Sequence, residues 1–417
     1  MKFIKQHYHW IVLVIVFLQN IIYGGLGNSE SVFVIPIVDA LGCTRGSYSL
    51  ATTTLAIVSA ISAAVSGKLF SKFGYQKTSI AGLLINSVAL AVQAFSQNLA
   101  MIAVSKALYG VGAGVLSTAG AVKVANSWFH KHRGLILGTL TMATGFGGSI
   151  MNVLLTAIIG ATDWRIAKLS AAAMLVAVAI LFLAVRNEPS DMGLQPYGEG
   201  QAPKKKEKFT DAWHGKTAKE LFRSPEFYLM CFCTLFSVIS VRLAASVVVP
   251  YYQDVGFTAA EAAVFSSVCM MSLAGAKLVC GWLSDRIGPK WVTMICMLCM
   301  LLTHTLMMFS DGLAVAYCSM VLMGMALVMT TIVAPLLTMP LFGYRAYDGA
   351  VGIFLALISI ANTVGSLAVN LLYDSCGSYK PAFRIAVVLD ILLIGLYGLL
   401  FWLCARIRRK CEEEAVS

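Results

Sequence analysis

Gly281-Trp282-Leu283-Ser284-Asp285-Arg286-Ile287-Gly288-Pro289-Lys290 is a charged segment between two long apolar segments of the chain. A glycine at each end of the first eight residues, followed by a proline, predicts a tight turn. About one helical turn before it lies a lone cation, Lys277, in a stretch that is otherwise apolar from Ala262 to Val279. A lysine at the centre of a membrane helix costs about 2.5–3.5 kcal/mol. Lys277 is therefore expected either to reach water with its long side chain or to bind a negative group.

The composition predicts that most of this chain is solvated by lipid. Of its 417 residues, 59% are hydrophobic and 12% are charged, and the mean hydropathy is +0.80. A soluble chain carries about 25% charged residues. The first apolar stretch is interpreted as a retained helix, because no small-residue cleavage site follows it. Since about 20 apolar residues cross a bilayer, the sequence predicts an all-α polytopic membrane protein with twelve transmembrane helices, near residues 10–37, 48–70, 78–97, 99–125, 134–159, 164–186, 226–251, 259–283, 290–310, 313–339, 347–373 and 382–405.

The positive charges predict the orientation of these helices. With both termini cytoplasmic, 22 of the 31 Lys and Arg residues fall on the inside, 5 at the outer ends and 4 within the spans. The outer five are Arg45, Arg165, Lys168, Lys380 and Arg384. Such a bias is typical of membrane proteins, whose cytoplasmic loops are basic. The net charge of +11 therefore has a topological cause and does not indicate nucleic acid, and the lysines at 204–206 are expected to face anionic lipid.

Two halves of the chain repeat each other. Gly67 to Gly74 follows the second span, and Gly281 to Gly288 follows the eighth, 214 residues later. We expect an N-terminal six-helix bundle at residues 1–186, a cytoplasmic linker at 187–225, and a C-terminal six-helix bundle with a short cytoplasmic tail at 226–417. Related halves of this kind predict a transporter, in which a site at the middle of the membrane is exposed to each side in turn.

Four charged residues lie deep within the predicted spans: Glu30, Lys106, Arg242 and Lys277. Intramembrane charges are rare and mostly functional. Three cations against one anion predict a positive cavity that selects anions. Arg242 is expected either to bind a carboxylate with its planar guanidinium or to form a structural salt bridge. Glu30 and Lys106 are expected either to pair, which would hold spans one and four together, or to exchange a proton.

These features resemble the major facilitator superfamily. The G-x-L-x-D-R-x-G pattern at 281–288 is similar to the loop motif of that family, and the copy at 67–74 departs from it, with Ser71 and Lys72 in place of the Asp and Arg. The resemblance implies two six-helix pseudo-symmetric bundles. It also implies a gate formed by the loop residues Gly67, Gly74, Gly281, Asp285, Arg286 and Gly288.

Four further motifs resemble the monocarboxylate transporter and oxalate:formate antiporter branch: Trp128-Phe129-x-x-x-Arg133-Gly134, Asp163-Trp164-Arg165, Glu188-Pro189-x-x-x-Gly193-Leu194-x-Pro196 and Pro225-Glu226-Phe227. In that branch a cation in span eight, just before the loop motif, binds the substrate carboxylate. Lys277 lies at that position, so the resemblance implies that it holds an anionic substrate. The chain departs from the branch elsewhere: span eleven has no second cation, and span one has Glu30 instead of the lysine of animal monocarboxylate transporters.

The sequence thus predicts a secondary active transporter that moves a small mono- or dicarboxylate, coupled to a proton or a counter-anion. It is expected to be a multi-pass protein of the cell (inner or cytoplasmic) membrane that functions as a monomer. Enzyme motifs are absent, and neither a cofactor nor a metal is expected; His304 is interpreted as a core residue. The alternative is a multidrug or other apolar-solute exporter coupled to protons, which the methionine-rich span ten favours: Met320, Met323, Met325 and Met329.

Overall fold

The computed structural model describes residues 7–116, 120, 123–124, 127–129, 133–197, 218–309, 312–331, 333–342 and 347–416. Within these residues the regular structure is helical, apart from one isolated bridge between Phe129 and Tyr197. Eleven helices of the described part are long and apolar enough to cross a membrane. The shorter apolar helix Leu99–Val115 occupies the place of the fourth predicted span. The predicted all-α polytopic fold is confirmed.

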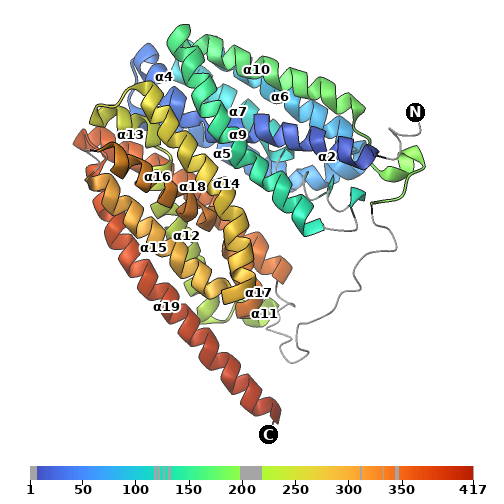
Figure 1. The fold of residues 1–417 in the computed structure, drawn as a ribbon, viewed down its shortest axis with the longest axis vertical. Helices are drawn as coiled ribbons and strands as arrows, with labels where there is room; N and C mark the ends of the chain where they lie inside the picture. The colour runs from blue at the N-terminus through green and yellow to red at the C-terminus, as the bar shows by residue number, and fades with distance from the viewer. Residues whose placement is uncertain are drawn as a thin grey trace. The chain divides into compact units, whose positions relative to one another are not determined.

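The chain divides into two compact units. Unit 1 comprises Met1–Lys205 and Tyr252–Ala274, and unit 2 comprises Lys206–Tyr251 and Gly275–Ser417. The principal helices before the linker, blue to green in Figure 1, are α2 (Tyr8–Gln19), α4 (Val34–Leu41), α5 (Arg45–Phe73), α6 (Tyr75–Ala94), α7 (Leu99–Val115), α9 (Arg133–Ala161) and α10 (Trp164–Leu181). Those after it are α12 (Pro225–Ala245), α13 (Val248–Val255), α14 (Ala259–Ile287), α15 (Pro289–Met308), α16 (Leu313–Ala326), α17 (Val333–Phe342), α18 (Tyr347–Cys376) and α19 (Lys380–Val416).

Helices that are distant in sequence pack together within each unit. In unit 1, α5 packs against α7, and α6 packs against both α7 and α10 (Figure 1). In unit 2, α12 packs against α18 and α19, and α15 packs against α16 and α19. Because these helices also expose large apolar side chains on their outer faces, lipid and not water is the medium that suits those faces.

The two halves share one register. Helices α5 and α14 each have 29 residues and begin 214 residues apart, and α6 and α15 each have 20 residues at the same offset. The starts of α7 and α16, and of α9 and α18, keep that offset too. Even the caps repeat: the Thr44 hydroxyl accepts a hydrogen bond from Ser47 N (3.2 Å), and the Thr258 hydroxyl accepts one from Glu261 N (3.3 Å). The predicted pseudo-symmetry is confirmed.

The segment quoted at the start is mostly helix, so the prediction of a turn over its whole length was wrong. Helix α14 continues to Ile287 and α15 begins at Pro289, which leaves Gly288 (φ +87°) as the turn. Gly74 (φ +80°) separates α5 from α6 in the same way. A single glycine is enough to form this turn, because it has no Cβ and adopts positive φ at little cost. That conformation ends the first helix and redirects the chain.

Other predicted spans are interrupted, among them span seven, which breaks between the end of α12 at Ala245 and the start of α13 at Val248. Span one passes from α2 into a π-helical turn (Asn20–Gly24), the short α3 (Gly25–Asn28) and a 3-10 turn (Glu30–Phe33) before α4. Span ten passes from α16 into a 3-10 turn (Leu327–Thr330) before α17. The glycines of span one explain its break, since glycine is among the weakest helix formers. Turns of the π type occur frequently at functional sites.

Small residues of α9 allow the first span to approach closely. A Cβ built on Gly147 would lie 1.9 Å from the carbonyl oxygen of Ile21, and one on Gly24 would lie 2.7 Å from Thr144 Cγ2. Gly147 is therefore packed tightly against the first span, whereas a Cβ on Gly138 of the same helix meets nothing within 4 Å among the described residues.

We expect Gly147→Ala to destabilise the protein, because the added methyl group must displace the backbone of the π-helical turn and not a flexible side chain. Overpacking costs about 1–3 kcal/mol, and a backbone obstacle favours the upper end of that range. Gly160→Ala, also in α9 but with nothing within 4 Å of the new Cβ, is the matched control and should be neutral or slightly stabilising. Thermal unfolding in detergent compares the two, and equal melting temperatures would contradict the packing assigned to Gly147.

Candidate functional site

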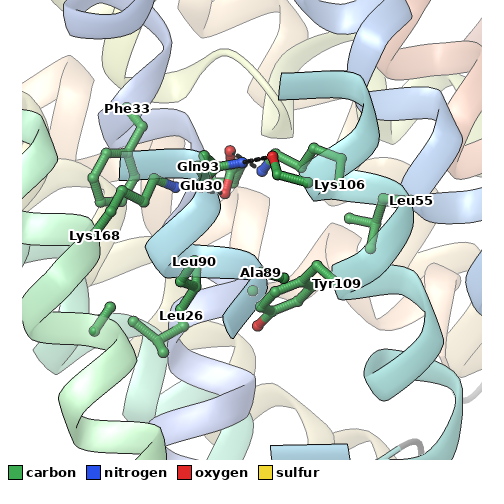
Figure 2. Close-up of a pocket in the computed structure, with 13 residues that line it drawn as sticks. Leu26, Glu30, Phe33, Leu55, Ala89, Leu90, Gln93, Lys106, Tyr109 and Lys168 are labelled. Atoms are coloured by element: carbon green, nitrogen blue, oxygen red, sulfur yellow. Dashed lines mark hydrogen bonds and ion pairs between the residues drawn. The ribbon is translucent and has the colours of Figure 1, made fainter. Parts of the chain in front are cut away.

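Glu30 is the centre of a charged cluster in unit 1. Its carboxylate forms ion pairs with Lys106 of α7 and with Lys168 of α10, where Nζ lies 3.4 Å from Glu30 Oε2. The Tyr48 hydroxyl of α5 donates a hydrogen bond of 2.7 Å to Glu30 Oε1, which also accepts one from Lys106. Figure 2 shows both lysines extending toward Glu30 from separate helices. Three helices and the broken first span thus meet at one carboxylate.

The break in span one positions this carboxylate. Ser29 departs from helical geometry at φ −102° and ψ 12°, and its hydroxyl donates a hydrogen bond of 2.9 Å to the Gly25 carbonyl. Glu30 then begins the 3-10 turn, and Phe33 ends it. The Nζ atom of Lys168 lies 3.5 Å from the centroid of the Phe33 ring, a cation–π contact. The same short turn therefore supplies both partners of Lys168.

A cavity of about 60 Å³ adjoins the cluster. Its lining consists of Leu26, Gly27, Glu30, Phe33, Leu55, Ala89, Leu90, Gln93, Ser105, Lys106, Tyr109, Lys168 and Ala171 (Figure 2). Two buried polar atoms of this lining, the Gln93 amide oxygen and the Tyr109 hydroxyl, have no hydrogen-bond partner among the described residues. Buried polar groups are nearly always hydrogen-bonded. These two atoms therefore indicate a place for a polar ligand or for water.

The cluster carries one more positive than negative charge. Both lysines are buried, Lys168 with 1% of its surface exposed, whereas 34% of the Glu30 side chain is accessible, since it lines the cavity. A buried charge is costly unless it is paired, and here two ammonium groups share one carboxylate. The Coulomb attraction of such a cluster for a small anion is strengthened by the low dielectric around it.

Arg242 and Lys277 lie in unit 2, on α12 and α14. The Arg242 Nε donates a hydrogen bond of 2.6 Å to the Asn362 side-chain oxygen on α18. Helix α18 comes close at this point, since a Cβ on Gly365 would lie 2.7 Å from Arg242 Cβ. Lys277 is half-buried. Among the residues predicted from sequence, the structure thus brings Glu30 and Lys106 into contact and places Arg242 beside an amide.

The family model of the Major Facilitator Superfamily matches residues 15–346 and 230–415. The chain belongs to the major facilitator superfamily. An uncharacterized MFS-type transporter, YcxA of Bacillus subtilis (strain 168), is 24% identical over 287 residues, which cover 68% of this chain and 67% of that protein. The oxalate:formate antiporter of Oxalobacter formigenes is 26% identical over 282 residues, 67% of this chain and 64% of that protein. Monocarboxylate transporter 14 of Homo sapiens is 25% identical over 195 residues, 46% of this chain and 37% of that protein.

Solved structures of major facilitators share the fold of this chain. The nucleoside transporter NupG superposes with a TM-score of 0.73 at 14% identity, covering 94% of this chain and 98% of that one. An inward-facing bacterial homolog to the human lysosomal transporter Spinster gives 0.71 at 15% identity, covering 96% and 97%. At such identities the likeness concerns the fold alone. The predicted fold, two pseudo-symmetric six-helix bundles, and the resemblance to the monocarboxylate and oxalate:formate branch are confirmed.

The loop residues of this major facilitator lie at the ends of matched helix pairs. Gly67 and Gly281 are within α5 and α14, whereas Gly74 and Gly288 form the one-residue turns. A Cβ on Gly74 would lie 2.7 Å from the side-chain amide of Asn187. The Arg286 guanidinium carbon lies 4.3 Å from the centroid of the Trp282 ring. The backbone of Asp285 is helical, and its side chain lies outside the described part of the chain.

Lys168 is a residue of the cluster that the sequence prediction placed at the outer end of span six. Helix α10 begins at Trp164, as predicted for span six, and the Asp163 carboxylate accepts a hydrogen bond of 2.6 Å from Trp164 N. Lys168, one turn inside the helix, is buried and paired with Glu30, which the sequence did not predict. The sequence did contain a signal that Lys168 lies on a buried helix face. Lys168 follows Trp164 by one turn and precedes Ala171 and Leu175 at helical spacing, and all three are buried.

A second buried polar cluster lies in unit 2 of this major facilitator. His304 Nδ1 is 2.7 Å from one carboxylate oxygen of Asp390, and the Ser240 hydroxyl donates a hydrogen bond of 2.5 Å to the other. All three residues are buried. His304 is thus a core residue with a partner, as predicted. Asp390 is fully buried in α19.

Proposed function

We propose that this major facilitator is a secondary active transporter that moves a small organic anion, a mono- or dicarboxylate, across the cell membrane. The observation that carries the proposal is the cluster in unit 1, in which two buried lysines share one carboxylate beside a cavity. An excess of buried positive charge favours an anion. The names of two relatives, an oxalate:formate antiporter and a monocarboxylate transporter, support the same substrate class.

Each site residue has a proposed role. Lys277 and Arg242 bind the substrate carboxylate, and Glu30 with Lys106 either couples a proton to transport or serves as an ion pair. The loop residues, with Asp285 and Arg286 foremost, form a gate whose contacts favour one of the two alternating-access states. The coupled ion is a proton or a counter-anion, the protein acts as a monomer, and both of its termini are cytoplasmic.

The buried methionines of unit 2 weaken the case for an exporter of apolar solutes. Met320, Met323 and Met329 are buried in the helical core. A flexible binding surface needs methionines that a ligand can reach. Their position favours the simpler interpretation, that these three side chains fill space between helices, whereas Met325 is partly exposed.

The proposal predicts which solutes compete for transport. In proteoliposomes that contain the purified protein, labelled acetate should enter faster than in protein-free liposomes. Unlabelled lactate or oxalate should reduce that entry, whereas uridine and the hydrophobic cation tetraphenylphosphonium should not. The measurement is initial uptake at fixed internal and external pH. Uptake of the hydrophobic cation without uptake of any carboxylate would contradict the proposed function.

A further inference from the structure

The contacts of Lys168 leave hydrogen-bonding capacity unused. Its ammonium group has three N–H donors, and its contacts are one long ion pair with Glu30 Oε2, at 3.4 Å, and the face of the Phe33 ring. Lys106, in contrast, shares Glu30 Oε1 with the Tyr48 hydroxyl in a short contact. Because only 1% of Lys168 is exposed, bulk water cannot supply the missing acceptors. Lys168 therefore suits one further acceptor better than Lys106 does.

The cavity beside Lys168 offers further polar groups without partners. The Tyr109 hydroxyl has no hydrogen-bond partner and can donate to an anion. Gln93 is 2% exposed, its amide oxygen has no partner, and its amide nitrogen makes one long hydrogen bond of 3.5 Å to the Ser105 hydroxyl. Figure 2 shows Lys168 and Tyr109 on different sides of the lining, with Glu30 and Gln93 nearby. The lining thus combines one ammonium, one hydroxyl and one amide group, each of which can form a further hydrogen bond.

The charge of the cluster specifies the valence of the missing partner. Lys106 and Lys168 contribute two positive charges and Glu30 one negative charge, so a single negative charge makes the cluster neutral. A dianion would instead leave a buried negative charge, which is costly in a low-dielectric site. The apolar part of the lining, with Leu26, Leu55 and Leu90, suits a short alkyl group. A short monocarboxylate has both features.

We propose that Lys168 is a substrate-binding residue and that the cavity in unit 1 is a second carboxylate-binding site, separate from the one proposed at Lys277 and Arg242, which takes a short monocarboxylate. The carboxylate accepts a hydrogen bond from Lys168, while Glu30 stays with Lys106 and Tyr48. The inference rests on the proposed function and narrows it, since it adds a binding residue that neither the sequence motifs nor the relatives indicate. It also ranks monoanions of carboxylic acids above dianions.

The test is calorimetric titration of the purified protein with sodium acetate in chloride-free buffer. Lys168→Gln should weaken acetate binding by about tenfold or more, since a hydrogen bond to a charged group is lost, and Lys168→Arg should keep part of the affinity. Arg165→Gln is the matched control: Arg165 is a cation of the same helix near its outer end, pairs with Asp163 at 3.5 Å, and should leave binding unchanged. Oxalate should bind more weakly than acetate.

Melting temperatures separate binding from folding. Lys168→Gln leaves Glu30 with Lys106 and Tyr48, so its melting temperature should remain near that of the unchanged protein. If Lys168→Gln melts early, its acetate binding is measured well below its melting temperature: weaker binding of the folded variant supports the proposal, and unchanged binding overturns it. Chloride that binds in a Lys168-dependent way without being displaced by acetate would also overturn it, because the site would then serve an inorganic anion.

The outcome for Lys168 is distinct from the outcome for the proposed function. If the unchanged protein binds and transports acetate and Lys168→Gln does so equally well, the inference fails and the proposed function stands. If the unchanged protein neither binds nor transports any carboxylate, the proposed function fails and the inference fails with it.

Discussion

Lys277→Ala should abolish carboxylate uptake in a protein that still inserts and folds. Lys277 is a half-buried cation of α14, one turn before Gly281, at the position where the monocarboxylate and oxalate:formate branch binds its substrate. A hydrogen bond to a charged group contributes about 1.5–3 kcal/mol, so its loss should reduce uptake about ten- to hundredfold. Lys277→Arg should retain part of the activity, because the charge survives while the compact ammonium becomes a planar fork. Lys277→Glu should be worse than Lys277→Ala, because it repels the anion.

Initial acetate uptake, normalised to folded protein, decides between two roles for Lys277. Lys290→Ala is the matched control, since Lys290 is an exposed lysine near the same turn, at the start of α15, and lies close to aromatic rings. It should leave uptake unchanged. If Lys277 only reaches toward the cytoplasmic water, its substitution should affect uptake as little as that of Lys290. Lys277→Ala would then take up acetate at a nearly normal rate, and Lys277→Gln would take it up as fast as Lys277→Arg. Near-normal uptake by Lys277→Ala would remove this residue from the substrate site.

Glu30→Gln should be the most damaging single change in the unit 1 cluster. It leaves two buried ammonium groups without their carboxylate, whereas Lys106→Gln leaves Glu30 with Lys168 and Tyr48. Breaking a buried ion pair costs roughly 3–5 kcal/mol, and Glu30→Gln should fall at the lower end because the carboxylate lines the cavity. Lys106→Gln should cost about 1–3 kcal/mol. The double variant should be less damaging than the sum of the two, since each single change leaves a charge that the other removes.

The double-mutant cycle measures that coupling directly. Melting temperature and acetate uptake are recorded for both single variants and for the double variant. The matched control is Asp39→Asn, which neutralises an exposed carboxylate on α4 and should change stability by less than about 0.5 kcal/mol. Strictly additive losses for Glu30 and Lys106 would mean that the two residues act independently, and the ion pair would then carry no energetic weight.

The fold was predictable because its determinants are local. Apolar runs of sufficient length locate the spans, and the paired glycines at 74 and 288 mark equivalent turns in the two halves. The breaks within spans one and ten were not predicted. Hydropathy depends only on composition, so it does not distinguish an α-helix from a π or 3-10 turn of the same residues. The extent of the turn after α14 was also wrong, since charged residues such as Arg286 continue a helix as readily as they end one.

The site was predictable only where a charge stands alone in an apolar span. Glu30 and Lys106 stood out in this way, but Lys168 lies four residues from a helix start and was counted with the outer residues. Tyr48, Phe33 and Tyr109 carry no sequence signal at all. Aromatic and hydroxyl side chains are ordinary in membrane helices, and their role here depends on which helices meet. That information resides in the packing of α5, α7 and α10 around the broken first span.

The constant offset between the two halves has an engineering consequence. From the capping threonines at 44 and 258 to the starts of α9 and α18, each equivalent helix start keeps the same 214-residue spacing. Equivalent helices of the two halves are therefore joined by connections of equal length. The starts of α10 and α19 are instead 216 residues apart, and those of α2 and α12 are 217 apart. Tags, fluorescent domains and chimaeric junctions therefore belong at these latter boundaries, where the two halves already differ in length, and not within the connections of equal length.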